Sequence, residues 1–584
     1  MPLKTTGCND DQSLLFSINP PNPATTLHPA SQENPVISAV SVDFFELDLK
    51  INISLFHSYE INVLLRDRIP RIDTALLTGT AHLAAPSLHS VSRGQKNGLK
   101  SERYMSHQRK HNTGYVLRIC GIAALGGILF GYDTAVISGA IEALKSYFDL
   151  SPAQTGWAVS NVVLGCVLGA FAAGPLAGRY GRKKALILAA VLFTISAVGA
   201  ALAASFTEFI IYRMIGGLAV GIAATVSPMY MSEVSPKDMR GRALSMQQFA
   251  IVFGQILIFY VNFKIASYAS EAWLVEMGWR WMLGSEVIPC LLFCLLVFII
   301  PESPRWNVMV GREDQALAML TRVSNESHAR SVLQEIKDSL QEDLKSAKQK
   351  LDYHDKRVRF ILFVGCMIAM LQQVTGVNVM MYYAPVVLKT VTSSAQEALF
   401  QTIWIGVLQL VGSVIGAMLM DRIGRLPLMR YGTLGTIAGL LITSYALYSE
   451  TTGYLALFGM LFFMLFYALS WGVGCWVLIS EIFPNRMRSQ GMSIAVGSMW
   501  VANFAVSQTF PMINDNPYLF STFHGAFPMW VFAACCVFSY WFICRFIPET
   551  KGVSLEKMEG VVMAKRYRQP IVDGKPLPLS NEKP

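Results

Sequence analysis

The stretch Gly174-Pro-Leu-Ala-Gly-Arg-Tyr-Gly-Arg-Lys183 recurs further along the chain as Gly416-Ala-Met-Leu-Met-Asp-Arg-Ile-Gly-Arg425. Two more pairs of motifs recur at nearly the same offset. They are Ser232-Glu-Val-Ser-Pro-Lys-Asp-Met-Arg240 with Ser480-Glu-Ile-Phe-Pro-Asn-Arg-Met-Arg488, and Pro301-Glu-Ser-Pro304 with Pro548-Glu-Thr-Lys551. Because three motif pairs share nearly one offset, the chain is predicted to consist of two structurally equivalent halves.

Apolar stretches long enough to cross a bilayer lie between these motifs. Hydrophobic residues make up 53% of the 584 residues and charged residues only 15%, which is too apolar for a soluble globular protein of this size. Roughly 20 apolar residues cross the hydrocarbon core, and twelve such stretches follow one another: 116–143, 157–178, 185–204, 208–231, 245–266, 281–300, 359–388, 401–420, 427–448, 454–479, 492–510 and 527–546. The sequence therefore predicts an all-α membrane protein with twelve transmembrane helices in two six-helix bundles, an architecture typical of transporters that rock around a site at mid-membrane.

Basic residues gather in the loops on one side of these spans. The loops after the second, fourth and eighth spans contain Arg179, Arg182, Lys183, Lys184, Lys237, Arg240, Arg242, Arg422 and Arg425. Loops on the other side contain little more than Lys145 and Lys389. Since cytoplasmic loops carry the excess of Lys and Arg, we expect both termini in the cytoplasm of a protein that spans the cell membrane many times. The formal net charge of +9 then follows from topology, and no nucleic-acid partner is implied.

The spans divide the chain into five parts. These are an N-terminal extension 1–113, a first bundle 114–300, a linker 301–358, a second bundle 359–548 and a cytoplasmic tail 549–584. The linker is polar and strongly charged, and we expect a small helical intracellular segment that begins with Ser303 as N-cap and Pro304 at the first helical position. A solvated linker between the bundles is the alternative.

No pattern in the sequence indicates a cofactor or a covalent reaction. Nine cysteines lie inside apolar spans and are interpreted as packing residues: Cys120, Cys166, Cys290, Cys294, Cys366, Cys475, Cys535, Cys536 and Cys544. No Cys/His spacing resembles a metal site, and no glycine-rich loop ends in Gly-Lys-Ser/Thr. No nucleophile and base stand at a plausible spacing, so we expect neither an enzyme nor an ATP-driven pump.

Several longer motifs carry a resemblance to a known family. They are Pro301-Glu-Ser-Pro-Arg-Trp306, Gln372-Gln-Val-Thr-Gly-Val-Asn378, Tyr382-Tyr-Ala-Pro385 and Pro548-Glu-Thr-Lys-Gly552. With these motifs the chain resembles the sugar-porter branch of the major facilitator superfamily, essentially from Tyr115 to Glu559. Two further stretches look most similar to bacterial D-xylose/proton symporters: Gln248-Phe-Ala-Ile-Val-Phe-Gly-Gln255 and Cys475-Trp-Val-Leu-Ile-Ser-Glu-Ile-Phe-Pro484. Neighbouring members carry glucose, galactose, arabinose or inositol, so the resemblance leaves the sugar open.

Amide side chains inside the spans are candidates for binding a sugar. Gln372, Gln373 and Asn378 lie in the seventh span and Gln248 in the fifth, where an amide exposed to lipid would be costly. An amide can donate to and accept from hydroxyl groups, and Trp476 and Trp500 offer aromatic faces for a sugar ring. A lone amide of this kind more often bonds a neighbouring helix, but here several occur together.

The resemblance extends this set of candidate binding residues. It implies sugar contacts from Phe130, Gln248, Gln372, Gln373, Asn378, Tyr382, Gln409, Gly472, Trp476 and Trp500. Two positions depart from the xylose pattern. Gln409 stands where Asn is usual, and Met499 stands where the xylose symporters have Gln. These departures concern the particular sugar and leave the class of monosaccharides unaffected.

Three ionisable residues lie inside spans of the first half. Asp133, Arg213 and Glu286 stand at depths of about 18, 8 and 10 Å from the outer span ends at ~1.5 Å per residue, so their side chains could meet. Burial of one such charge costs ~2.5 to 3.5 kcal/mol even on permissive scales, which makes each a functional candidate. A purely structural ion pair is the alternative. The resemblance implies proton coupling, because proton-coupled sugar porters carry Asp at the position of Asp133.

Charged residues at the cytoplasmic span ends are candidates for gating. They are Arg179, Arg182, Glu233, Asp421, Arg422, Arg425 and Glu481. The arginines could pair with the two glutamates and with helix termini to hold the inner face closed, or they could serve only as topology anchors. Gly178 stands where the family usually has Asp, so the contacts of the first half are expected to be weaker or differently satisfied.

The sequence therefore predicts a symporter that moves a monosaccharide together with a proton by alternating access, with no cofactor. Its expected partners are the sugar, the proton and the lipid bilayer, and it is expected to function as a monomer. A facilitative uniporter and a transporter of polyols or cyclic acids such as inositol or quinate are alternatives. A non-transporting sugar sensor is another, although it would need a longer signalling tail than the residues after Glu559 provide.

The N-terminal extension generates the first testable prediction. Residues 1–104 mix Pro, Ser, Asn and scattered charges without a span-length apolar run or a secretory signal pattern, so we expect a disordered stretch or a mis-assigned start codon. A chain that starts at Met105 should insert and transport as well as the full chain, measured as uptake at equal membrane abundance. A large loss of uptake would instead assign the extension a regulatory role.

Overall fold

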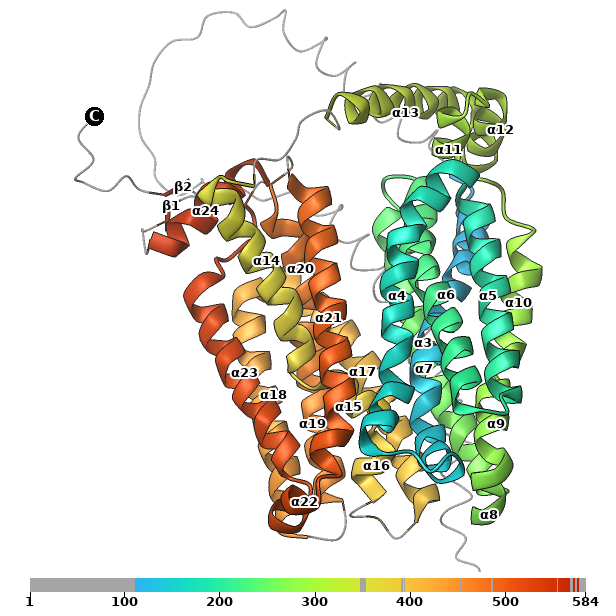
Figure 1. The fold of residues 1–584 in the computed structure, drawn as a ribbon. Coiled ribbons are helices and arrows are strands. Elements are labelled where there is room, and N and C mark those ends of the chain that lie inside the picture. Colours follow the sequence, from blue (N-terminus) through green and yellow to red (C-terminus); the bar gives the residue numbers. More distant parts are fainter. Residues whose placement is uncertain are drawn as a thin grey trace, which may run out of the picture. The chain divides into compact units, whose positions relative to one another are not determined.

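The apolar segments of the first half fold as long helices (Figure 1). Their bounds are α3 Thr113–Tyr147, α4 Pro152–Tyr180, α5 Arg182–Leu202, α6 Phe206–Val234 and α7 Arg240–Ser267, followed by a sixth span built from α8 Glu271–Trp273, η1 Leu274–Gly278, α9 Trp279–Gly284 and α10 Val287–Val297. At the start of α4, the Ser151 side chain accepts the N–H of Gln154, whose own side chain bonds back to the backbone of Ser151. This capping box satisfies N–H groups that a helix start leaves free.

The second half repeats the arrangement with six further spans. Their helices are α14 Lys356–Val374 with α15 Val377–Tyr382 and α16 Ala384–Lys389, α17 Ala395–Ile423, α18 Arg425–Tyr448, α19 Leu455–Tyr467 with η2 Ala468–Gly472 and α20 Val473–Ile482, α21 Arg488–Asn514, and α23 Phe527–Phe546. A short helix, α22 Pro517–Phe523, lies between α21 and α23.

The computed structural model describes residues 111–346, 353–389, 392, 394–450, 454–484, 487–553, 555–567, 571–572 and 575–576. These helices belong to one compact unit. Our expectation for residues 1–110 lies outside the described residues.

The predicted fold class is confirmed. Ten spans of the described chain are long and apolar enough to cross a membrane. The remaining two spans, α18 and α21, are 24 and 27 residues long, which is sufficient at ~1.5 Å rise per residue. The chain is an all-α membrane protein with twelve transmembrane spans in two six-helix bundles.

The segment between the halves is helical, as predicted. It contains α11 Pro304–Met309, α12 Glu313–Val323 and α13 Glu326–Ser346. The Ser303 side chain accepts the N–H of Trp306, and Pro304 occupies the first helical position of α11. After the last span, helix α24 Leu555–Tyr567 is followed by two short antiparallel strands, β1 Ile571–Val572 and β2 Lys575–Pro576.

The seventh span differs from the continuous stretch 359–388 that the sequence predicted. Helix α14 ends at Val374, and Gly376 adopts a left-handed conformation with φ of 90° before α15 begins. An L-residue with a side chain rarely adopts such a φ, which explains why glycine stands there. The break places Asn378 and Tyr382 on a short helix of their own. Discontinuous helices are a recurrent feature of transporter binding sites.

Two other spans contain a turn of π-helix. One is η1 in the sixth span and the other is η2 in the tenth. A π turn widens the helix and frees backbone carbonyl groups, and such turns occur frequently at functional sites. The π turns therefore make the sixth and tenth spans candidates for a functional site.

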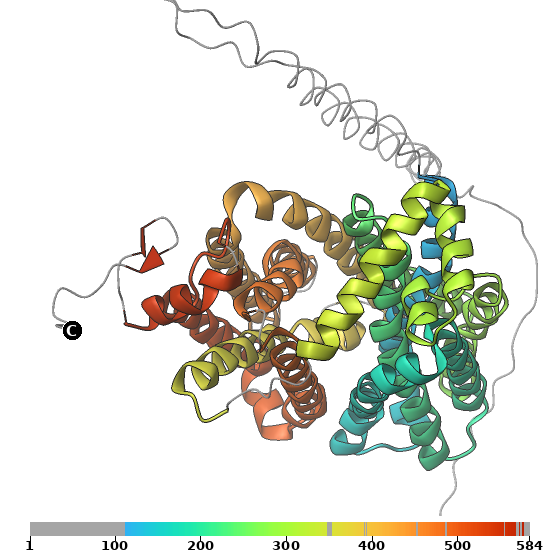
Figure 2. The ribbon, with the colours of Figure 1, turned by 90° about the horizontal axis from the view of Figure 1, so that it is seen from above.

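Figure 2 shows the helices of each half side by side, seen from above. Small residues let some of these helices approach closely. A methyl group added to Gly217 of α6 would overlap the carbonyl oxygen of Val162 on α4, and one added to Gly439 of α18 would overlap the backbone of Phe463 on α19. Close approach through glycine is a common way for transmembrane helices to associate, because lipid leaves no hydrophobic force to drive them together.

Candidate functional site

An ion pair lies at the centre of the first bundle. A guanidinium nitrogen of Arg213 on α6 donates to a carboxylate oxygen of Asp133 on α3 at 2.6 Å, and also reaches the backbone oxygen of Asp133 at 3.3 Å. Both side chains are 1% exposed. Gly216 makes room for the pair, because an added methyl group would stand 3.2 Å from the Asp133 carboxylate and overlap Ser196. The two charges are therefore held together in a buried pocket.

A third charged residue, Glu286, lies next to this pair. It precedes α10, is 2% exposed, and interacts electrostatically with both Asp133 and Arg213. Within the described chain, Glu286 Oε1, Asp133 Oδ2 and Arg213 Nε have no hydrogen-bond partner. The sequence predicted that these three side chains could meet, and the structure brings them into one cluster. Burial of incompletely paired charges lowers stability, so the cluster is a candidate functional site.

A chain of amide hydrogen bonds crosses the second bundle. Gln372 Nε2 donates to the backbone oxygen of Trp471 at 3.1 Å, and Gln373 Nε2 donates to Gln372 Oε1 at 3.1 Å. Asn378 Nδ2 donates to Gln373 Oε1. Trp471 belongs to the π turn η2, and Asn378 follows the break at Gly376. The predicted amides of the seventh span thus link the two irregular spans of this half.

The other predicted binding residues lie in varied surroundings. Tyr382 is buried at 6% exposure, whereas Trp476 is 43% exposed. Met499, which departs from the xylose pattern, is buried at 4% exposure. Gly472 closes the π turn η2. The rings of Phe130 in the first half and Trp500 in the second half are 6.5 Å apart.

Four glutamines show where sequence reasoning was incomplete. Gln248 is exposed and is not part of the amide chain, while its neighbour Gln247 is buried with both amide atoms unpaired within the described chain. Gln255 and Gln409 each have a buried side-chain oxygen that is likewise without a partner there. Gln247 and Gln255 were not predicted as site residues, although Gln255 ends the quoted motif that begins at Gln248.

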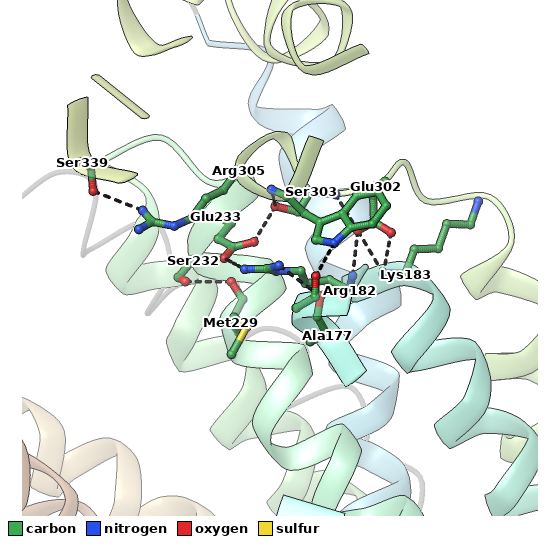
Figure 3. Close-up of polar contacts among 12 residues, drawn as sticks. Ala177, Arg182, Lys183, Met229, Ser232, Glu233, Glu302, Ser303, Arg305 and Ser339 are labelled. Atoms are coloured by element: carbon green, nitrogen blue, oxygen red, sulfur yellow. Dashed lines mark hydrogen bonds and ion pairs between the residues drawn. The ribbon is translucent and has the colours of Figure 1, made fainter. Parts of the chain in front are cut away.

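A charged cluster lies at one end of the first bundle, where α4 is followed by α5 (Figure 3). Arg182 at the start of α5 pairs with Glu233 at the end of α6 at 2.7 Å, and the Ser303 hydroxyl donates to the other oxygen of Glu233. The Glu302 carboxylate accepts the backbone N–H groups of Arg182 and Lys183 at 2.9 and 3.1 Å. A carboxylate at a helix N-terminus is stabilised by the helix dipole.

The second bundle repeats this cluster. Arg425 pairs with Glu481 at 3.0 Å, and the Thr550 hydroxyl donates to Glu481 at 2.5 Å. Glu549 accepts the backbone N–H groups of Arg425 and Leu426 at 3.0 and 2.9 Å. The recurring Pro-Glu-Ser and Pro-Glu-Thr motifs therefore supply equivalent contacts, which the sequence comparison matched without assigning them a role.

The two clusters differ at one position. Asp421 adds an ion pair with Arg425 at 3.4 Å, whereas its equivalent in the first half is Gly178. There the backbone oxygen of Gly178 accepts the indole N–H of Trp306 at 2.8 Å. This bond does not involve Arg182, so the expectation that the contacts of the first half are weaker or differently satisfied stays a prediction.

The arginine–glutamate pairs form within each half. Arg182 reaches Glu233 of its own bundle, and Arg425 reaches Glu481 of its own bundle. Arg179 and Arg422 are exposed and take part in no ion pair of the described residues. The pairs thus stiffen the individual bundles, and their predicted closure of the inner face stays a prediction.

Polar contacts between the halves lie at the opposite end of the spans. Lys145 in the last turn of α3 pairs with Asp515 after α21 at 2.5 Å, and Lys389 pairs with Glu142 at 3.1 Å. The side-chain oxygen of Gln508 on α21 accepts a hydrogen bond from the Ser160 hydroxyl at 2.7 Å. Its amide nitrogen donates to the backbone oxygen of Ala153 at 2.9 Å. The conformation is therefore held together across the halves at this end. The sequence predicts Lys145 and Lys389 only as the few basic residues on this side, without partners.

Comparisons with known proteins place these features in a family. A family model described as "Sugar (and other) transporter" matches residues 119–561. The D-xylose-proton symporter of Escherichia coli (strain K12) is 41% identical over 478 residues, which cover 77% of this chain and 96% of that protein. The arabinose-proton symporter of Bacillus subtilis (strain 168) is 35% identical over 452 residues, with coverage of 77% and 96%. A solved structure of the xylose transporter XylE from E. coli in an inward open conformation has a TM-score of 0.68 at 39% identity and covers 76% of this chain and 99% of that one.

The contacts between the halves generate a second prediction. Asp515→Asn removes the charge that pairs with Lys145, and a partly exposed ion pair is worth ~0.2 to 1 kcal/mol. We therefore expect the population open at this end to rise about 1.4- to fivefold, measured by double electron–electron resonance between spin labels at Ser146 and Tyr518. Glu271→Gln, which removes an exposed carboxylate at the same end, is the matched control. Equal distance distributions in both variants would show that the pair does not hold this end closed.

Proposed function

The chain belongs to the Sugar (and other) transporter family, and on that premise we propose that it is a proton-coupled monosaccharide symporter working by alternating access. Its substrate would be a pentose or hexose similar to D-xylose. The proposal draws on the similarity to D-xylose-proton and arabinose-proton symporters, on the buried charges of the first bundle and on the amide chain of the second.

The buried cluster of Asp133, Arg213 and Glu286 is the observation that carries proton coupling. One guanidinium can balance only one of the two carboxylates, so full ionisation of the cluster would leave a net negative charge in a buried site. A single bound proton removes that charge. When the proton binds Asp133, the attraction to Arg213 weakens and Arg213 becomes free to move. Protonation would thus change the contacts between α3 and α6.

The amide chain supports sugar binding in the second bundle. Gln372, Gln373 and Asn378 bond one another and the Trp471 carbonyl group in this structure, so a sugar hydroxyl could replace any of these contacts without leaving an amide unpaired. These bonds join the break in the seventh span to the π turn in the tenth. A bound sugar that replaced them would therefore change the contacts of both irregular spans. Binding could therefore be transmitted to the ends of the helices.

The distribution of contacts supports a rocking motion. Each half is stiffened by its own arginine–glutamate cluster, whereas the polar contacts between the halves gather at the end near Lys145 and Asp515. Two stiff halves that touch at one end can rock, so that the contacts at this end open while contacts at the other end form. The match to an inward open relative is consistent with this end being the outer one.

The remaining parts of the proposal concern location and assembly. We place the protein in the cytoplasmic membrane with both termini and the arginine–glutamate clusters on the cytoplasmic side, since basic residues gather there. We propose that a single chain suffices, because both predicted sites lie within one chain.

A third prediction tests the sugar site. Gln372→Ala should weaken D-xylose binding about three- to tenfold, because a neutral hydrogen bond contributes ~0.5 to 1.5 kcal/mol. Gln401→Ala is the matched control, since Gln401 is equally buried at 4% exposure in the same half but bonds Glu397 on its own helix. Isothermal titration of the purified variants measures the effect. If Gln372→Ala binds as tightly as the control, the amide chain is not the sugar site.

The fourth prediction tests proton coupling. Asp133→Asn keeps the shape of the side chain but cannot titrate, so coupling should be lost while exchange of sugar continues. Vesicles with this variant should exchange labelled for unlabelled sugar at equal pH, yet fail to accumulate sugar when the outside is acidified. Accumulation that persists would assign the proton to another group, with Glu286→Gln as the next variant. A wild type without pH-driven accumulation would favour the uniporter.

A further inference from the structure

Four cationic residues come together at the end of the second bundle that also holds its arginine–glutamate cluster. Arg430 comes from the second turn of α18, Arg545 from the last turn of α23, and Lys565 and Arg566 from the last turn of α24. Arg545 Nη2 donates to the backbone oxygen of Arg566 at 3.4 Å. Lys565 interacts electrostatically with Arg430 and Arg545. Three separate helices thus direct positive charge to one place, here called the basic cluster.

The basic cluster has no acidic counterpart among the described residues. None of its four members forms an ion pair there, and Arg430 Nε and Arg545 Nη1 are buried without a hydrogen-bond partner in the same part of the chain. Burial, followed by the charge of Arg430, lowers the pKa of Lys565 below its usual range. Like charges gathered at partly buried positions repel one another, so the cluster would be stabilised by an anion.

Helix dipoles explain only part of this arrangement. A cation in the last turn of a helix is stabilised by the partial negative charge of the C-terminus, which accounts for Arg545, Lys565 and Arg566. Arg430 stands near the N-terminal end of α18, where the dipole disfavours a cation. Its position beside the other three therefore needs a different reason.

Aromatic side chains around the basic cluster indicate its depth. Arg566 lies over the ring of Phe360 at 4.4 Å, and Arg545 lies over the ring of Phe546 at 4.9 Å. Tyr431, Trp541 and Tyr567 nearby in the sequence are 70%, 51% and 60% exposed. Exposed Tyr and Trp gather at the level of lipid head groups, so the basic cluster lies where a head group would be.

We propose that the basic cluster binds the phosphate of an anionic phospholipid from the cytoplasmic leaflet. The planar guanidinium groups of Arg430 and Arg545 suit bidentate contacts to phosphate oxygens, and basic pockets between spans on this side are known to take anionic head groups. The proposal rests on the membrane orientation proposed above. A bound phosphate would tie α24 to the ends of α18 and α23.

The first test measures lipid binding to the full chain. In detergent, native mass spectrometry should show phosphatidylglycerol retained by the wild type and phosphatidylcholine not retained. Arg430→Gln with Arg545→Gln should bind phosphatidylglycerol at least about tenfold more weakly, as expected for the loss of charge-assisted hydrogen bonds. Lys184→Gln with Arg242→Gln removes two exposed cations of the first half and should bind as the wild type does. Equal retention by all three proteins would overturn the proposal.

A second measurement uses the wild type alone and therefore does not depend on folding of a variant. The lowered pKa makes Lys565 reactive toward acylating reagents at mildly alkaline pH, and a bound phosphate should raise that pKa and slow its acylation severalfold. The exposed Lys184 is the internal control. Slowing by phosphatidylglycerol but not by inorganic phosphate supports a lipid site, whereas equal slowing by both, or by neither, overturns it. Sugar exchange in the same preparation reports separately on the proposed function.

Discussion

A charge inside hydrocarbon must meet an opposite charge or a proton, and the structure depends on this constraint in its first bundle. Asp133 and Arg213 are both 1% exposed and bond at 2.6 Å, while Glu286 adds a second carboxylate that the same guanidinium cannot also balance. Isolated ions of this kind would each cost several kcal/mol on burial, roughly. The cluster therefore persists only because its members hold one another, and any change in its proton count alters how α3, α6 and the sixth span are held together.

Charges are also paired at the ends of the spans. In both halves an arginine pairs with a glutamate of a neighbouring helix, and a second glutamate caps the helix that carries the arginine. Neither cluster crosses to the other half, whereas Lys145 and Asp515 do cross at the opposite end. The proton binding proposed for one half and the sugar contacts proposed for the other can therefore be linked through the relative motion of the halves, without a continuous path of hydrogen bonds between the two sites.

Much of this arrangement could be read from the sequence, because membrane spans and their repeats leave strong patterns. Twelve apolar stretches, three repeated motifs and the few ionisable residues within spans predicted the fold and placed Asp133, Arg213 and Glu286 at compatible depths. Local helix breaks were missed, since Thr375 and Gly376 look like an ordinary interruption in an apolar run, and a π turn such as η2 has no sequence signal of its own. The partners of Lys145 and Lys389 could not be predicted either, because they depend on how two halves distant in sequence come together.

The central claim is that sugar and proton move together. It is tested most directly by adding D-xylose to weakly buffered, de-energised vesicles that contain the full chain and recording the external pH. If the protein is a symporter, sugar entry draws protons inward and the medium becomes more alkaline, in proportion to the labelled sugar taken up. Sugar uptake without any change of external pH would contradict the claim and identify a facilitative carrier.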